Sequence, residues 1–219
     1  MKASLAQRTV AECLGTAFLL AAVVGSGIMA ARLAGGNGAL ALLCNTLPTG
    51  AVLTVLILTF GPISGAHFNP AVSAAMALRG ELAARSTAIY ICAQVIGGVL
   101  GVWAAHIMFE LPLWQVSATA RAGSGQWLAE GIATFGLVLT ILGCGARTPS
   151  AVPYAVGLYI TSAYWFTAST YFANPAVTVA RSLSNTFTGI APVGVAPFIA
   201  AQLIGMLAAV TIARWLWRS

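Results

Sequence analysis

Two short Asn-Pro-Ala motifs are the residues of this sequence with the clearest chemical potential. They lie at Asn69-Pro70-Ala71 and Asn174-Pro175-Ala176, and each opens a short apolar segment. Asn is favoured at a helix N-cap, and Pro suits the first helical position, where its missing N–H costs nothing. Each motif therefore predicts the start of a half-helix. Two such ends facing one gap would offer positive dipole ends and amide donors, which attract a neutral solute with lone pairs and repel a cation.

Other reactive groups are scarce. The chain has four acidic residues, all Glu, and two histidines, His67 and His106, that are far apart in sequence. No acid–base pair or nucleophile arrangement is visible, and the four cysteines lack CxxC spacing. We therefore predict no catalytic residue, no metal site, no cofactor and no enzymatic activity.

The composition indicates an integral membrane protein. Apolar residues make up 59% of the 219 residues and charged residues only 6%, against about 25% charged in a soluble domain. The ten basic residues are spread singly, so the net charge of +6 does not predict a nucleic-acid partner. The expected environment is the lipid bilayer, with residues 1–219 forming a single domain.

Six apolar runs have the length of a membrane span, and two shorter runs lie between them. A spanning helix needs about 20 residues. The six runs are Thr9–Leu33, Ala39–Phe60, Ser86–Phe109, Gly125–Gly145, Val152–Tyr171 and Val195–Trp217. The shorter runs, Asn69–Leu78 and Asn174–Leu183, are typical of re-entrant half-helices. The predicted fold class is an all-α membrane protein with six transmembrane helices and two re-entrant half-helices.

The sequence also contains an internal repeat. Glu12 is matched by Glu130 at an offset of 118, Gln94 by Gln202 at 108, and Asn69 by Asn174 at 105, each with similar neighbours. Each unit has three spans. Because three is an odd number, the chain leaves the first unit on the side of the membrane opposite to where it began, and the second copy must enter from that side. We expect two inverted repeats, at about 1–111 and 112–219, whose broken segments meet near the midplane.

Basic residues predict the orientation. With the N-terminus inside, seven are cytoplasmic and three are outside, as the positive-inside rule expects. The seven are Lys2, Arg8, Arg79, Arg85, Arg147, Arg214 and Arg218, and the three are Arg32, Arg121 and Arg181. Both termini are therefore expected in the cytoplasm of a multi-pass protein.

Glu12 and Glu130 lie inside predicted spans, where an acid is by default a functional residue. They could relay protons in a coupled transporter or accept hydrogen bonds as structural groups. Their equivalent positions in the two repeats favour the structural role.

The sequences SGAHFNPAV and ANPAV, the Ala-Glu pairs and the Ala-Gln pairs resemble the aquaporin, or major intrinsic protein, family over the whole chain. The resemblance implies an hourglass-shaped pore and a homotetramer with one pore per subunit in the inner (plasma) membrane. It also implies that Asn69 and Asn174 are the central donors. Glu12, Glu130 and His67 resemble the residues that brace the re-entrant loops in that family.

The selectivity filter departs from the water-selective pattern. Val177 stands where the family usually has an arginine, and Arg181 is one helical turn further on and need not face the pore. The other expected filter positions are Thr49, Ser162 and Tyr171. These residue types predict a wide filter without arginine. The combination resembles bacterial aquaglyceroporins associated with arsenic resistance, which implies arsenite, methylated arsenicals, glycerol-like polyols or urea as solutes, with or without water.

Two other functions fit the sequence. A coupled secondary transporter uses the same inverted-repeat architecture, and uptake that collapses with a protonophore would reveal it. A structural membrane protein with a low-flux pore would show negligible flux in liposomes.

Overall fold

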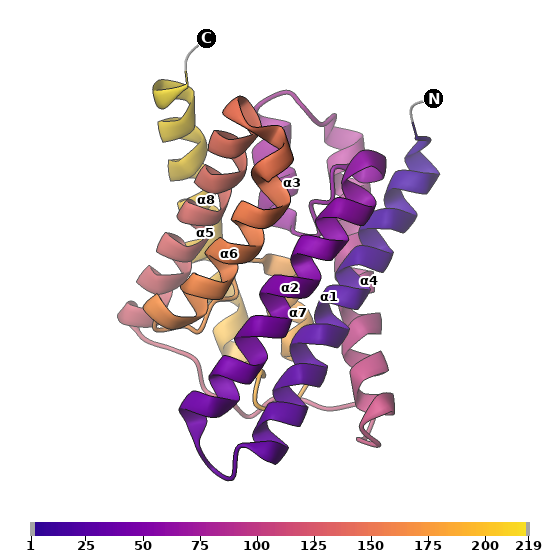
Figure 1. The fold of residues 1–219 in the computed structure, drawn as a ribbon, viewed down its shortest axis with the longest axis vertical. Coiled ribbons are helices and arrows are strands. Elements are labelled where there is room, and N and C mark those ends of the chain that lie inside the picture. Colours follow the sequence, from indigo (N-terminus) through magenta and orange to yellow (C-terminus); the bar gives the residue numbers. More distant parts are fainter. Residues whose placement is uncertain (1–2, 218–219) are drawn as a thin grey trace.

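The computed structural model describes residues 3–217, which contain α-helices and one 3₁₀ turn but no strand (Figure 1). The elements are α1 (Leu5–Leu33), α2 (Gly38–Ser64), α3 (Pro70–Leu78), α4 (Ala84–Met108), α5 (Ser124–Arg147), η1 (Pro149–Ala151), α6 (Val152–Phe166), α7 (Pro175–Arg181) and α8 (Pro192–Leu216). Lys2 and Arg218, two of the basic residues used to predict the orientation, lie outside the described residues. The described chain begins and ends at the same end of the bundle, here called the terminal end (Figure 1).

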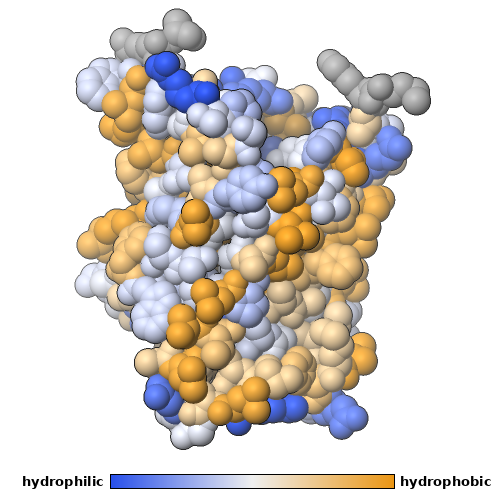
Figure 2. Space-filling model, in the orientation of Figure 1, coloured by the Kyte–Doolittle hydropathy of each residue, from blue (hydrophilic) through white to orange (hydrophobic). Residues whose placement is uncertain are grey.

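The long helices have the length and composition of membrane spans. Five of them, α1, α2, α4, α5 and α8, are long and apolar enough to cross a bilayer. Figure 2 shows apolar side chains along the flank of the molecule, whereas the most hydrophilic side chains gather at its two ends. This distribution is the one expected where lipid covers the flank and water covers the ends.

The remaining expected span, Val152–Tyr171, is shorter than predicted. Helix α6 has 15 residues, a rise of about 22 Å, and ends at Phe166 because Thr167 is extended. Thr170 and Tyr171 then adopt positive φ angles of 57° and 59°. An uninterrupted helix could not make this turn, which brings the backbone back to the start of α7.

The two half-helices begin at the predicted residues. Asn69 caps α3 and Asn174 caps α7, and a proline follows each cap at the first helical position. Each Asn Oδ1 accepts a bond from the backbone N–H two residues later, at 2.8 Å for Asn69 and 3.0 Å for Asn174. Both asparagines are buried, so the half-helices start inside the protein rather than at its surface.

Glycines allow the long helices to pack closely. Helix α1 packs on α4, and α5 packs on α8. A Cβ atom on Gly101 of α4 would lie 2.1 Å from the Ala17 carbonyl oxygen of α1, and one on Gly205 of α8 would lie 2.1 Å from the Gly131 oxygen of α5. Because the obstacle is backbone in both cases, the helices could not accept a side chain without separating.

The same substitution should therefore have opposite effects at two helical glycines. We expect Gly101→Ala to lower the melting temperature in detergent, with a cost of about 1–3 kcal/mol from overpacking. Gly145→Ala, where no atom lies within 4 Å of the new Cβ, should be neutral or stabilising by up to about 1 kcal/mol. Thermal unfolding followed by size-exclusion chromatography measures both variants. Equal melting temperatures would show that α1 and α4 are not in close contact.

Candidate functional site

The loops that precede the half-helices have a strained backbone. Before α3, Ala66 and Phe68 have φ angles of 51° and 48°, and before α7, Tyr171 and Ala173 have φ angles of 59° and 45°. Residues with a Cβ rarely adopt this left-handed region, and each costs about 1–3 kcal/mol. Specific interactions must hold both loops in place.

Glu12 holds the first loop. Its Oε1 accepts bonds from the Ser64 hydroxyl at 2.6 Å and the His67 N–H at 2.9 Å, and its Oε2 accepts from the Phe68 N–H at 2.7 Å. The Gln94 amide of α4 donates to the same Oε2 at 2.8 Å. A carboxylate is suited to this position because it accepts at both oxygens and donates at neither.

Glu130 holds the second loop in the same way. It accepts bonds from the Phe172 N–H at 3.0 Å and the Ala173 N–H at 2.8 Å. The Gln202 amide of α8 donates to it at 2.6 Å and also lies 2.9 Å from the Thr178 hydroxyl. Both glutamates are fully buried, and their bonds satisfy backbone groups that no helix satisfies.

The two capping asparagines link the loops to each other. The Asn69 Nδ2 donates to the Ala173 carbonyl at 2.7 Å, and the Asn174 Nδ2 donates to the Phe68 carbonyl at 2.8 Å. A side-chain amide has two N–H groups. One N–H of each asparagine is thus committed to the opposite loop, and the other is available to a guest.

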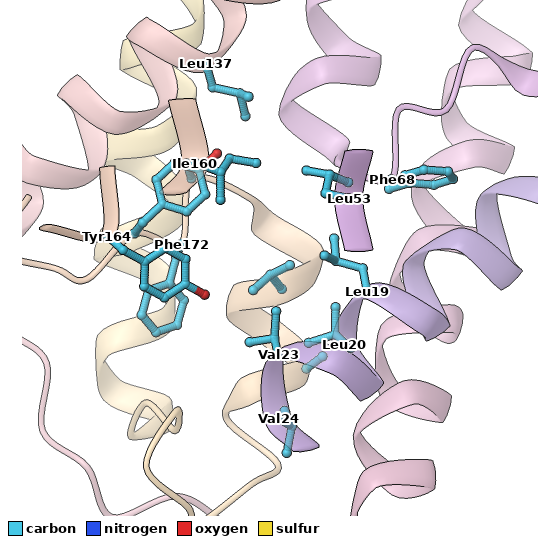
Figure 3. Packing of buried hydrophobic residues seen from close by; sticks show 14 of the residues in the cluster. Leu19, Leu20, Val23, Val24, Leu53, Phe68, Leu137, Ile160, Tyr164 and Phe172 are labelled. Atoms are coloured by element: carbon cyan, nitrogen blue, oxygen red, sulfur yellow. The ribbon is translucent and has the colours of Figure 1, made fainter. Parts of the chain in front are cut away.

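Both asparagines line a cavity of about 290 Å³. The cavity is lined by Met76, near the end of the first half-helix, and Glu81, beyond it, and also by Thr49 and by Arg181 at the end of the second half-helix. Its remaining wall is mostly aliphatic or aromatic. Figure 3 shows Ile160, Tyr164 and Phe172 facing Leu19, Val23 and Leu53, all of which line the cavity.

Three of the four expected filter residues line the cavity, and the fourth does not. Thr49, Tyr171 and Val177 are buried and lie on its wall. Ser162 is exposed on the outer face of α6, where its hydroxyl donates to the Tyr159 carbonyl at 2.7 Å. The assignment of Ser162 to the filter is therefore wrong.

Tyr164, two residues later, takes the place expected for Ser162. Its ring stacks on that of Tyr171 at a centroid distance of 5.9 Å, and its hydroxyl lies 3.4 Å from the Thr49 hydroxyl. An error of two residues in the register of α6 turns the side chain by about 200°, from the cavity to the surface. Tyr164, rather than Ser162, therefore shares the cavity wall with Thr49, Tyr171 and Val177.

Arg181 is buried and lies on the cavity wall, one turn beyond Val177. The sequence left the direction of this side chain open, and the predicted absence of arginine concerns the filter position, which Val177 occupies. Residues four apart on a helix share a face, which brings both side chains to the cavity. The spacing was visible in the sequence, but the direction of the α7 face was not.

His67 lies on the wall beside Asn69. Its Nδ1 is 3.0 Å from the Ser73 hydroxyl of α3, and its backbone N–H binds Glu12. His106, in contrast, is fully buried away from the cavity, where it contacts the Leu113 carbonyl and the Ser184 hydroxyl.

Comparison with known proteins identifies relatives of the chain. The Major intrinsic protein family model matches residues 1–171. The chain is 56% identical over 212 residues to "Aquaglyceroporin AqpS" of Rhizobium meliloti, which covers 97% of this chain and 91% of that protein. It is 30% identical over 249 residues to "Probable aquaporin AqpM" of Archaeoglobus fulgidus, covering 99% and 98% of the two chains.

A solved structure shares the fold. The crystal structure of the aquaglyceroporin from Plasmodium falciparum superposes with a TM-score of 0.69 over 95% of both chains, at 22% sequence identity. The aquaporin-like fold predicted from the sequence is thereby confirmed.

The hydrogen bonds of Glu130 lead to a test of its role. Each oxygen of the Glu130 carboxylate accepts a bond from one backbone N–H of the loop. In Glu130→Gln an amide NH₂ group replaces one of these oxygens, so a donor would face a donor. We expect a loss of about 1–3 kcal/mol in stability, seen as a lower melting temperature and lower yield of folded protein. Glu110→Gln is the matched control, because Glu110 is exposed rather than buried. A Glu130→Gln variant as stable as the control would contradict the bracing role.

Proposed function

Because the chain belongs to the major intrinsic protein family, we propose that it is a passive membrane channel for small neutral solutes, with the cavity between α3 and α7 as its pathway. The observation that carries this proposal is the pair Asn69 and Asn174. Each keeps one N–H free in a cavity whose wall is mostly apolar. A solute with lone pairs can exchange water for these two donors, whereas a cation meets donors rather than acceptors between the two asparagines and loses its hydration.

The solutes we propose are glycerol-like polyols, urea, arsenite and methylated arsenicals, together with water. The wall around Val177 supports this range because it combines apolar contacts with the hydroxyls of Thr49 and Tyr164. Such a wall suits molecules that carry both hydroxyl and apolar groups. The relative from Rhizobium meliloti, named an aquaglyceroporin, also supports it.

We also propose that residues of about 1–111 and 112–219 are inverted repeats. The matching roles of Glu12 and Glu130 toward the backbone of the two loops support this, as do those of Gln94 and Gln202. The reciprocal bonds of Asn69 and Asn174 fit a two-fold axis between them.

For the protein in its membrane, we propose an inner (plasma) membrane location, a homotetrameric assembly and a cytoplasmic terminal end. Arg79 and Arg214 lie at this end, where the Arg214 guanidinium donates to the Leu78 carbonyl. A concentration of basic residues at one end supports that orientation. The family resemblance supports the tetramer.

Stopped-flow light scattering of proteoliposomes tests the function. Water, glycerol, urea, arsenite and methylarsenicals are compared with empty liposomes at equal lipid concentration. We expect solute flux that is linear in the gradient and unaffected by a protonophore. Flux that collapses with the protonophore would indicate a coupled transporter, and no flux for any solute would indicate a structural protein.

Two residues of α6 test which face lines the passage. We expect Tyr164→Ala to raise glycerol permeability relative to water on the order of tenfold, equivalent to a barrier lower by about 1.4 kcal/mol. Ser162→Ala, its control on the same helix, should leave the ratio unchanged because Ser162 is exposed. A larger effect at Ser162 than at Tyr164 would overturn the placement of α6.

A further inference from the structure

Arg121 lies in the loop between α4 and α5, but its side chain binds two other loops. Its Nε donates to the Gly189 carbonyl at 2.8 Å, in the loop between α7 and α8. Its Nη1 donates to the Ser169 carbonyl and to the Thr170 hydroxyl, each at 3.1 Å, in the loop that precedes α7. One guanidinium, with its fork of five donors, thus connects three segments that are far apart in the sequence.

The backbone that carries Arg121 is anchored to the start of α8. The Thr119 carbonyl accepts a bond at 2.7 Å from the N–H of Ala191, the N-cap of α8. A Cβ atom on Gly194 of α8 would lie 2.7 Å from the Arg121 carbonyl oxygen, so the loop lies directly against the helix. The side chain therefore acts from a fixed base.

The loop before α3 is held differently at the equivalent residue. Ser64 and Ser169 are 105 positions apart, which is the offset of the two Asn-Pro-Ala motifs. The Ser64 carbonyl accepts a bond from the Tyr90 hydroxyl at 2.9 Å, and the Ser64 hydroxyl donates to Glu12 at 2.6 Å. The Ser169 hydroxyl, in contrast, is buried and has no hydrogen-bond partner among residues 3–217.

Phe198 is the residue equivalent to Tyr90, at the offset of 108 that relates the two Ala-Gln pairs. The Tyr90 ring lies edge-on to that of His67 at a centroid distance of 5.4 Å. The Phe198 ring lies edge-on to that of Phe172 at 5.3 Å, so the two pairs are equivalent in space as well as in sequence. Because phenylalanine has no hydroxyl, the second loop needs another donor, and Arg121 supplies it.

Tyr171 lies between the residues that Arg121 and Glu130 hold. Arg121 binds Thr170, and Glu130 accepts a bond from the Phe172 N–H at 3.0 Å. Thr170 and Tyr171 have left-handed φ angles of 57° and 59°, which residues with a Cβ adopt only under constraint. Without Arg121 the backbone can relax on the α6 side of the loop, and the Tyr171 ring then leaves its place on the cavity wall.

We propose that Arg121 is a positioning residue that determines the solute selectivity of the cavity through Tyr171. Arg121 lies outside the cavity wall, whereas the Tyr171 ring is part of that wall and stacks on the Tyr164 ring. Arg121 thus acts by fixing a residue that solutes meet. This inference rests on the proposed function, because selectivity is a property of a protein that conducts.

The ratio of glycerol to water permeability in proteoliposomes measures this role. A ratio does not depend on the amount of folded protein, which is what a merely structural residue would change. We expect Arg121→Gln to raise the ratio severalfold, because a displaced Tyr171 ring no longer limits the larger solute.

Arg32→Gln is the matched control. The Arg32 guanidinium also donates to a backbone carbonyl, that of Phe109, at 3.1 Å and lies over a phenylalanine ring, but both residues are outside the cavity wall. Its ratio should equal that of the wild type. An equal rise in both arginine variants would overturn the assignment to Arg121.

A double-mutant cycle tests whether Arg121 acts through Tyr171. If the tyrosine transmits the effect, Arg121→Gln should change the ratio little when Tyr171→Ala is already present. Fold-changes that simply multiply in the double variant would show independent action and overturn the proposal.

A second substitution should restore the lost hydrogen bond. In the Arg121→Gln background, Phe198→Tyr supplies a hydroxyl that can donate to the Ser169 carbonyl, as Tyr90 donates to the Ser64 carbonyl. We expect the ratio to return toward the wild-type value. A ratio that stays at the Arg121→Gln value or rises further would contradict the role assigned to the bond at Ser169.

Hydrogen–deuterium exchange of the detergent-solubilised protein needs no transport and separates this inference from the proposed function. In Arg121→Gln, exchange should rise in residues 167–171 but not in residues 64–66, the equivalent part of the first loop. An unchanged permeability ratio with unchanged exchange overturns the role of Arg121 and leaves the channel intact. Absence of wild-type flux for every solute overturns the channel, and exchange then decides whether Arg121 holds the loop.

Discussion

The structure depends on supplying hydrogen-bond partners for the backbone of two non-helical loops inside a protein that lipid surrounds. Two loops leave the helical conformation deep in the bundle, and their N–H groups would be unpaired there without special partners. Glu12 and Glu130 supply those partners, each accepting two consecutive backbone N–H groups. Burying a carboxylate and holding several residues in the left-handed region both cost free energy. The hydrogen bonds that each carboxylate accepts at its two oxygens offset this cost.

The orientation of these loops determines what the cavity offers. Because the backbone N–H groups of residues 67, 68, 172 and 173 turn toward the glutamates, they do not face the cavity. The donors that remain between the two half-helix starts are the asparagine amides, already tied by one bond each to the opposite loop. Most of the cavity wall is thus apolar, with the amide donors lying between the half-helices.

At the far end of the cavity, the aromatic and aliphatic wall and the charged group come from different residues. Val177 and the stacked pair Tyr164 and Tyr171 lie on the cavity wall, whereas the charge of Arg181 lies one helical turn further along α7. Phe172 connects the second loop to this charge. Its N–H binds Glu130, and its ring supports the Arg181 guanidinium, so a single residue links the loop brace to the charge.

The sequence by itself determined the membrane class, the half-helix starts at Asn69 and Asn174, and the pairing of equivalent glutamates, because these depend on composition, local capping and long-range repetition. It did not determine the end of α6 or the direction of its faces. Helix α6 stops at Phe166, and the loop that follows it reaches Glu130. The Phe172 and Ala173 N–H groups that bind Glu130 are 42 and 43 positions away from it in the sequence. Spacing predicted Ser162 as the residue of α6 in the filter, and only packing against α2 and α5 decides that Tyr164 faces the cavity instead. Arg181 was likewise visible as a residue, but its burial depends on Phe172 and Thr188, which the fold brings beneath it.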